Sequence, residues 1–136
     1  MVPSLDSPDG RPFASARSAI LVVEDELLIR LIVSEALREA GYDVIEAFNA
    51  DEALEILRSS ARVDLVISDV RMPGSLDGLG LLAHVRATFP RLPVILTSGH
   101  LDPTQALSHG ATQFLSKPYG LDAVVTAVRN ELARPS

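Results

Sequence analysis

Polar side chains stand at the ends of four short apolar runs in this chain. The runs cover residues 19–23, 63–67, 93–96 and 114–115, and the polar residues at their ends are Glu24, Asp25, Asp69, Thr97 and Lys117. If the runs are parallel strands of one sheet, these side chains lie along a single edge. Open α/β sheets bind ligands outside the carboxyl ends of their strands. The sequence therefore predicts a site that combines carboxylates, a hydroxyl and an ammonium group.

Carboxylates brought together at one edge repel one another, and a hard divalent cation relieves that repulsion. Mg²⁺ is usually held through one or two carboxylates, with waters and substrate phosphate completing its octahedron. We expect Asp25 and Asp69 to be direct ligands and Glu24 to contact the metal through water. Asp69 also fits the role of a nucleophile that takes a phosphoryl group as an aspartyl phosphate.

Lys117 is the only lysine among 12 basic residues, and the other basic residues are arginines. A compact ammonium on a flexible stem suits a position where one point charge meets a single oxygen, which the planar guanidinium fork of arginine does not. We expect Lys117 to bind one phosphoryl oxygen and the Thr97 hydroxyl, with nearby backbone N–H groups, to bind another. Phosphoryl transfer requires little of a protein beyond such positioning and charge neutralisation.

Hydrophobic periodicity predicts the elements that hold these residues. Short runs rich in Val and Ile, typical of buried parallel strands, occur at 19–24, 42–47, 63–68, 93–97 and 111–115. Between and after them the period changes to that of a helix. The helical stripes are Ile29, Ile32, Val33, Ala36 and Ala40; Ala50, Ala53, Leu54 and Leu57; Leu82, Val85 and Phe89; and Leu121, Val124, Val125, Val128 and Leu132. Strands alternating with helices indicate an α/β fold with a doubly wound, five-stranded parallel sheet.

Local signals mark where several of these helices begin and end. Gly41 suits a left-handed cap after the first helix, and Pro90 ends the third. The pair Asp102-Pro103 resembles an N-cap followed by a proline in the first turn of a helix, and Gly110 closes that segment. This fourth helix is predicted to be short, with an apolar stripe reduced to Ala106 and Leu107.

Composition limits the classes of function. A net charge of −6 without any basic cluster argues against direct nucleic-acid binding. The chain has no cysteine, which fits a reducing compartment, and no apolar run long enough to span a membrane, so we expect a cytoplasmic protein. Residues 1–18 are predicted to be a flexible tail, 19–133 a single domain and 134–136 a short end.

Taken together, the motifs resemble the receiver domains of two-component response regulators. The resemblance rests on Glu24-Asp25, on Asp69 with Met72-Pro73 and Asp77-Gly78 beyond it, on Thr97, and on Lys117-Pro118, and it covers residues 19 to about 133. It implies a flavodoxin-like (βα)5 fold with strand order 2-1-3-4-5. It also implies Mg²⁺ as cofactor and a sensor histidine kinase or histidine phosphotransfer protein as phosphodonor, with small-molecule phosphodonors possible.

The resemblance implies further roles for individual residues. The backbone carbonyl of Arg71 is expected to bind the metal, and the Lys117-Pro118 bond is expected to be cis. Thr97 is expected to move toward the phosphoryl group while the aromatic side chain of Phe114 turns inward behind it; plain core packing is the other interpretation of Phe114. One departure is the loop Gly74-Ser75-Leu76, which is one residue longer than is common in the family.

Three functional hypotheses follow from these observations. The favoured one is a stand-alone receiver that acts on no substrate beyond its own phosphoryl group and signals to an unknown downstream protein by contact or onward phosphotransfer. A phosphohydrolase with an aspartate nucleophile is disfavoured because Arg71 occupies the place, two residues after Asp69, where such enzymes usually carry a second acid. A receiver-like binding module that is never phosphorylated is the third.

Overall fold

The computed structural model describes residues 17–72, 74, 76–99 and 103–134. Five parallel strands form one sheet in the order β2-β1-β3-β4-β5. The strands are β1 (Ala19–Val23), β2 (Asp43–Ala47), β3 (Leu65–Asp69), β4 (Val94–Ser98) and β5 (Gln113–Ser116). This order confirms the predicted fold class.

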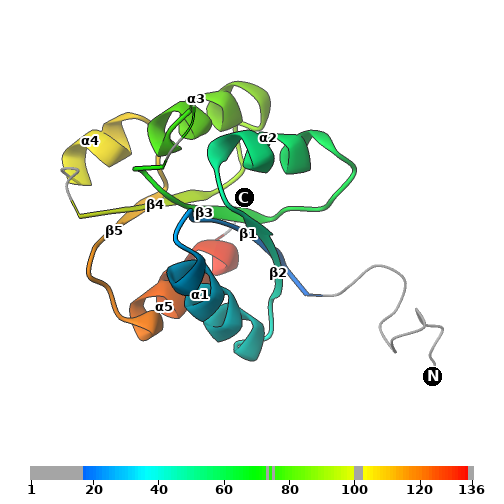
Figure 1. Cartoon of the computed structure of the whole chain (residues 1–136), viewed down its shortest axis with the longest axis vertical. Helices are drawn as coiled ribbons and strands as arrows, with labels where there is room; N and C mark the ends of the chain where they lie inside the picture. The colour runs from blue at the N-terminus through cyan, green and yellow to red at the C-terminus, as the bar shows by residue number, and fades with distance from the viewer. Residues whose placement is uncertain (1–16, 73, 75, 100–102, 135–136) are drawn as a thin grey trace.

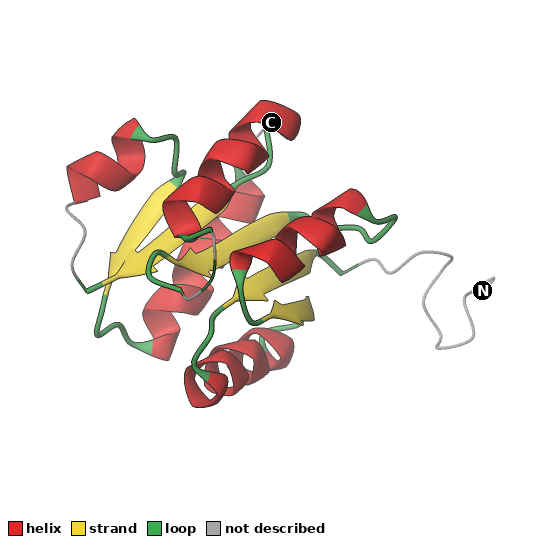
Figure 2. Cartoon of the chain, turned by 45° about the horizontal axis from the view of Figure 1, so that its top comes forward, coloured by secondary structure: helices red, strands yellow, loops and turns green. Residues whose placement is uncertain are grey.

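A helix follows each strand, and the helices cover both faces of the sheet. They are α1 (Leu27–Glu39), α2 (Ala50–Arg58), α3 (Gly78–Thr88), α4 (Pro103–Ser108) and α5 (Leu121–Ala133). In Figure 1, α2, α3 and α4 lie above the sheet, and α1 and α5 lie below it. Figure 2 shows the strands between these two helical layers. Among the described residues, no helix has the length and apolar character that crossing a bilayer requires.

Two apolar clusters, one on each face, hold the layers together. Alternate strand residues divide between them, so that Ile20 and Val22 face α1 and α5 whereas Leu21 and Val23 face α2 and α3. All four side chains are almost fully buried. Because the sheet is covered on both faces, the central strands β1, β3 and β4 are buried along their whole length and are mostly apolar, which explains the apolar runs in the sequence.

The predicted buried face of α1 is partly wrong. Ile32 is 45% exposed, and Ala40 is also exposed, whereas Leu37, outside the predicted stripe, is completely buried beside Val33. The outer surface of this helix carries leucines as well, so apolar periodicity does not distinguish the face that packs on the sheet. The other predicted stripes face the core at most of their positions.

Helix ends agree with several of the predicted signals. Gly41 follows α1 with φ +102, and Gly110 follows α4 with the same value, as left-handed caps require. Strand bounds shift by one or two residues, so that Asp69 is the last residue of β3 and Thr97 is the last but one of β4. Several predicted features lie outside the described residues. They are the cap Asp102, Pro73 of the Met72-Pro73 motif, Ser75 of the longer loop, and nearly all of the tail at 1–18. The tail therefore stays a prediction.

Candidate functional site

The carboxyl ends of β1, β3, β4 and β5 bring the predicted polar residues together. Parallel pairing places Asp69 of β3 directly beside Thr97 of β4. Glu24 follows the last residue of β1, and its N–H donates to the carbonyl of Ala47 at the end of β2. Lys117 follows β5, and its N–H donates to the carbonyl of Ser98. The edge of the sheet thus fixes the backbone of each residue.

Lys117 connects the carboxylates of the site. Its Nζ lies 3.1 Å from Asp69 Oδ2 and 3.4 Å from Glu24 Oε1, and it donates a hydrogen bond to each. Both carboxylates are largely buried, while Lys117 is partly exposed. The peptide bond between Lys117 and Pro118 is cis, as predicted.

Burial governs the electrostatics of these three groups. Loss of hydration raises the pKa of Asp69 above its ordinary value, although hydrogen bonding to Lys117 opposes this effect. Burial likewise raises the pKa of Glu24, against a hydrogen bond from the Glu26 N–H. Burial alone would lower the pKa of Lys117, but its hydrogen bond to Asp69 and the two negative charges raise it. The carboxylates are therefore incompletely compensated by the single ammonium group.

The acidic residues fit a divalent cation. One carboxylate oxygen from each of Glu24, Asp25 and Asp69 lies within 4.8 Å of the others. Asp25 is exposed, and it opens with Asp69 and Lys117 onto a cleft of about 360 Å³. Oxygen ligands of this kind, with room for waters, suit Mg²⁺. Arg71 also lines the cleft, and the role of its backbone carbonyl as a metal ligand stays a prediction.

Thr97 and Phe114 occupy different sides of β4 and β5. The Thr97 side chain is 2% exposed and lines a small inner cavity with Asp69, on the side of the sheet that α1 covers. Phe114 pairs with Leu96 and packs, partly buried, against the cluster beneath α2, α3 and α4. Their predicted roles in a conformational switch are not tested by this arrangement.

Three supporting residues were missed by sequence reasoning. Arg30 of α1 donates from Nη1 to the carbonyl of Glu24 at 2.9 Å and from Nε to Glu46 at 3.1 Å, which anchors the loop after β1. Gly78 packs against the backbone of Asp69 so closely that no side chain fits. Tyr119 also lines the inner cavity with Thr97. Only the Asp77-Gly78 pair was visible as a signal, without its structural reason.

Comparison with known proteins agrees with this geometry. Residues 20–129 match the response regulator receiver domain family. The DNA-binding transcriptional regulator NtrC of Escherichia coli is 38% identical over 120 residues, which are 86% of this chain and 25% of that protein. The sensor kinase CckA of Brucella abortus is 38% identical over 124 residues, 88% of this chain and 13% of that protein. The chain thus spans a quarter or less of these two relatives.

Solved structures of similar size match over most of both chains. The receiver domain of NtrX from Brucella abortus has a TM-score of 0.79 and 36% identity, covering 85% of this chain and 99% of that chain. The chemotaxis response regulator CheY4 of Vibrio cholerae has a TM-score of 0.78 and 30% identity, again covering 85% and 99%. Sequence and fold therefore lead to the same family.

Proposed function

Because the chain belongs to the response regulator receiver domain family, we propose that Asp69 accepts a phosphoryl group from a phosphohistidine in a two-component system or phosphorelay. The observation that carries the proposal is the placement of Asp69. Its carboxylate ends β3, is held by Lys117 at 3.1 Å, and borders the open cleft beside Glu24 and Asp25. A carboxylate in such a position can act as a nucleophile.

The chemistry is a transfer between two nucleophiles. An Asp69 carboxylate oxygen forms a bond to phosphorus while the bond from phosphorus to the histidine nitrogen breaks, and the leaving imidazole keeps the electron pair. Lys117, already beside Asp69, is placed to meet a phosphoryl oxygen and neutralise its charge. Mg²⁺ bound by Asp25 and Asp69 would supply further charge neutralisation. Thr97 and the backbone N–H groups of its loop would bind another oxygen.

The partners follow from this chemistry. We infer that a sensor histidine kinase or a histidine phosphotransfer protein donates the phosphoryl group; one relative is itself named a sensor kinase. Exposed apolar side chains on α1, which begins two residues after Asp25, offer that donor a docking surface: Leu27, Leu28, Leu31 and Ile32. The downstream partner is a further protein, reached by contact or onward transfer.

We place this reaction in the cytoplasm and confine its chemistry to the protein's own aspartyl phosphate. Relatives named as DNA-binding regulators act where the DNA is, which supports the compartment. Arg71 lies two residues after Asp69, and an arginine cannot act there as the general acid that hydrolysis of an external phosphate ester would need. Formation and loss of the phosphoryl group on Asp69 are then the only covalent steps.

One experiment separates the three functional hypotheses. The protein is incubated with Mg²⁺ and acetyl phosphate, and separately with a phosphate monoester, while bound phosphoryl and released phosphate are both measured. A receiver retains up to one phosphoryl group per chain from acetyl phosphate and does not turn over the ester. Sustained release from the ester would establish a phosphohydrolase, and no labelling with no Mg²⁺ binding would establish an unphosphorylated binding module.

A further inference from the structure

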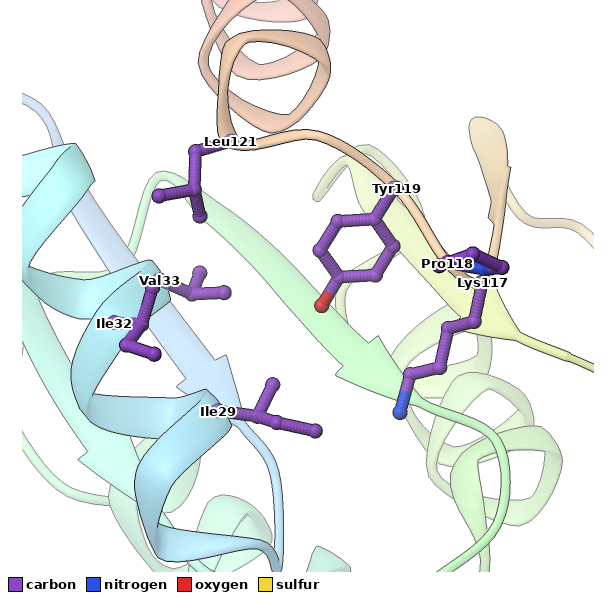
Figure 3. A pocket seen from close by; sticks show the side chains of 7 residues that line it. All are labelled: Ile29, Ile32, Val33, Lys117, Pro118, Tyr119 and Leu121. Carbon is purple, nitrogen blue, oxygen red and sulfur yellow. The ribbon is translucent and has the colours of Figure 1, made fainter.

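Tyr119 lies between two spaces in the molecule, and it shares that position with Ile29 and Val33 of α1. On one side is an apolar groove of about 450 Å³ between α1 and the start of α5, lined with Ile29, Val33 and Leu121. On the other side is the inner cavity of about 10 Å³ that Tyr119 shares with Asp69 and Thr97. Figure 3 shows the Tyr119 ring between Lys117 and the α1 side chains, with its hydroxyl directed inward.

Thr97 lies on the side of Tyr119 that faces the inner cavity. Its side chain contributes to the inner cavity, whereas its neighbours Ser98 and Gly99 line the open cleft where a phosphoryl group on Asp69 would lie. A cavity of this size holds at most one water molecule, so the groups around it are closely packed. The Thr97 hydroxyl therefore faces protein groups in the described state.

Tyr119 and Thr97 line that space together with the two buried acidic residues Glu24 and Asp69. Burial raises the pKa of Tyr119, and the nearby charge of Lys117 opposes this effect, as does hydrogen bonding with the Thr97 side chain. Each hydroxyl can donate or accept. In a space with so little water, a hydrogen bond between the two hydroxyls lowers the free energy, because a buried polar group without a partner is unfavourable.

We propose that Tyr119 is a positioning residue that holds the Thr97 hydroxyl in the inner cavity and so opposes the phosphorylated state. This inference rests on the proposed function. A phosphoryl group on Asp69 must draw Thr97 from the phenol, and the phenol then needs another partner. The Tyr119 ring also lines the groove between α1 and α5, so phosphorylation of Asp69 changes the environment of that groove.

Binding of beryllofluoride with Mg²⁺, a stable mimic of the phosphoryl group, tests the inference. Tyr119→Phe keeps the ring and removes the hydroxyl, so it should bind beryllofluoride about 2- to 10-fold more tightly than the wild type, the range that one modest hydrogen bond allows. Tyr42→Phe changes the only other tyrosine and is the matched control. In a Thr97→Val background, Tyr119→Phe should have no effect, because the interaction is already absent.

Tyrosine ring NMR gives a second readout, since the chain carries two tyrosines and no tryptophan. The ring carbon that bears the Tyr119 hydroxyl should shift on adding beryllofluoride, and that of Tyr42 should not. Equal affinities of wild type and Tyr119→Phe, or an identical gain in the Thr97→Val background, would overturn the inference alone. If the wild-type protein binds no beryllofluoride at all, the proposed function fails and the inference with it.

Discussion

The two acidic residues after β1 have different surroundings although they are neighbours in the sequence. Glu24 is 4% exposed, and its two oxygens already accept hydrogen bonds from Lys117 and from the Glu26 N–H. Asp25 is exposed at the cleft. A carboxylate with both oxygens engaged reaches a metal more readily through water than directly, and the division into an outer and an inner ligand stays a prediction.

A substitution at each position measures this division. Asp25→Ala should weaken Mg²⁺ binding by about 100-fold or more, and Glu24→Gln by about 10-fold. The reason is that a ligand bound through water contributes less to metal affinity than a direct ligand does. Titration with Mg²⁺ followed by NMR ranks the two variants. Asp122→Asn, which removes an exposed carboxylate at the start of α5, is the control and should bind like the wild type. A reversed ranking of the two site variants would show that the ligand assignment is wrong.

Asp69 should lower the stability of the metal-free protein at neutral pH. Its pKa and that of Glu24 are raised by burial, so their favourable contribution is fully present below their ordinary values of 3.8 and 4.5. That contribution is lost as the pH rises through the raised values. In EDTA at neutral pH, Asp69→Asn should therefore melt a few degrees above the wild type, since about 1 kcal/mol moves the midpoint of a small domain by about 4 °C.

Thermal melts at a series of pH values check the sign of this effect. The advantage of Asp69→Asn should shrink as the solution is acidified through the raised pKa of Asp69 toward its ordinary value of 3.8, because the buried wild-type carboxyl becomes protonated over that range. Mg²⁺ should stabilise the wild type more than the variant. A variant that melts below the wild type at neutral pH would show that the Lys117 ion pair outweighs burial.

The first residue of α3, Gly78, packs closely against the end of β3, the strand that carries Asp69. The N–H of Gly78 donates to the carbonyl of Val70 at 2.8 Å, and the Asp77 side chain accepts from the N–H of Gly80. A Cβ at position 78 would meet the carbonyl oxygen of Asp69 and lie 2.7 Å from Val70 Cα. Neither neighbour is a flexible side chain, so the backbone around Asp69 would have to move.

Gly78→Ala should therefore lower the free energy of unfolding by about 1–3 kcal/mol. Urea denaturation measures it. Gly120→Ala is the matched control, because nothing lies within 4 Å of a Cβ there and its φ of −83 suits any residue. We expect the control to change stability by less than about 0.5 kcal/mol. Equal effects of the two substitutions would argue against the close packing of α3 on β3.

The helix best placed to respond to phosphorylation is α4. It has six residues, of which Ala106 is buried, and Leu107 is exposed. Few buried contacts therefore oppose its movement. Amide NMR shifts on adding beryllofluoride should be large in α4, around Thr97 and in the strand of Phe114. Shifts restricted to the metal ligands and α3 would place the response elsewhere and rule out the Phe114 switch.

At the scale of the whole molecule, the strand pattern and the polar residues at strand ends predicted both the fold and the composition of the site. The carboxyl ends of parallel strands lie at one edge of the sheet. The convergence of residues far apart in the sequence can therefore be predicted without knowing their contacts. Periodicity failed on α1, because Leu27 and Leu31 on its outer side are as apolar as the residues that it buries. Tyr119 was missed because its relation to Thr97 depends on side-chain packing across 22 positions of sequence.

Intact-mass measurement shows directly whether this domain carries a phosphoryl group on Asp69. Wild type, Asp69→Asn and Asp122→Asn are each incubated with Mg²⁺ and acetyl phosphate. The proposed role of Asp69 predicts that the wild type and Asp122→Asn each gain the mass of one phosphoryl group and that Asp69→Asn gains none. Equal labelling of Asp69→Asn, or no labelling of the wild type, would contradict it.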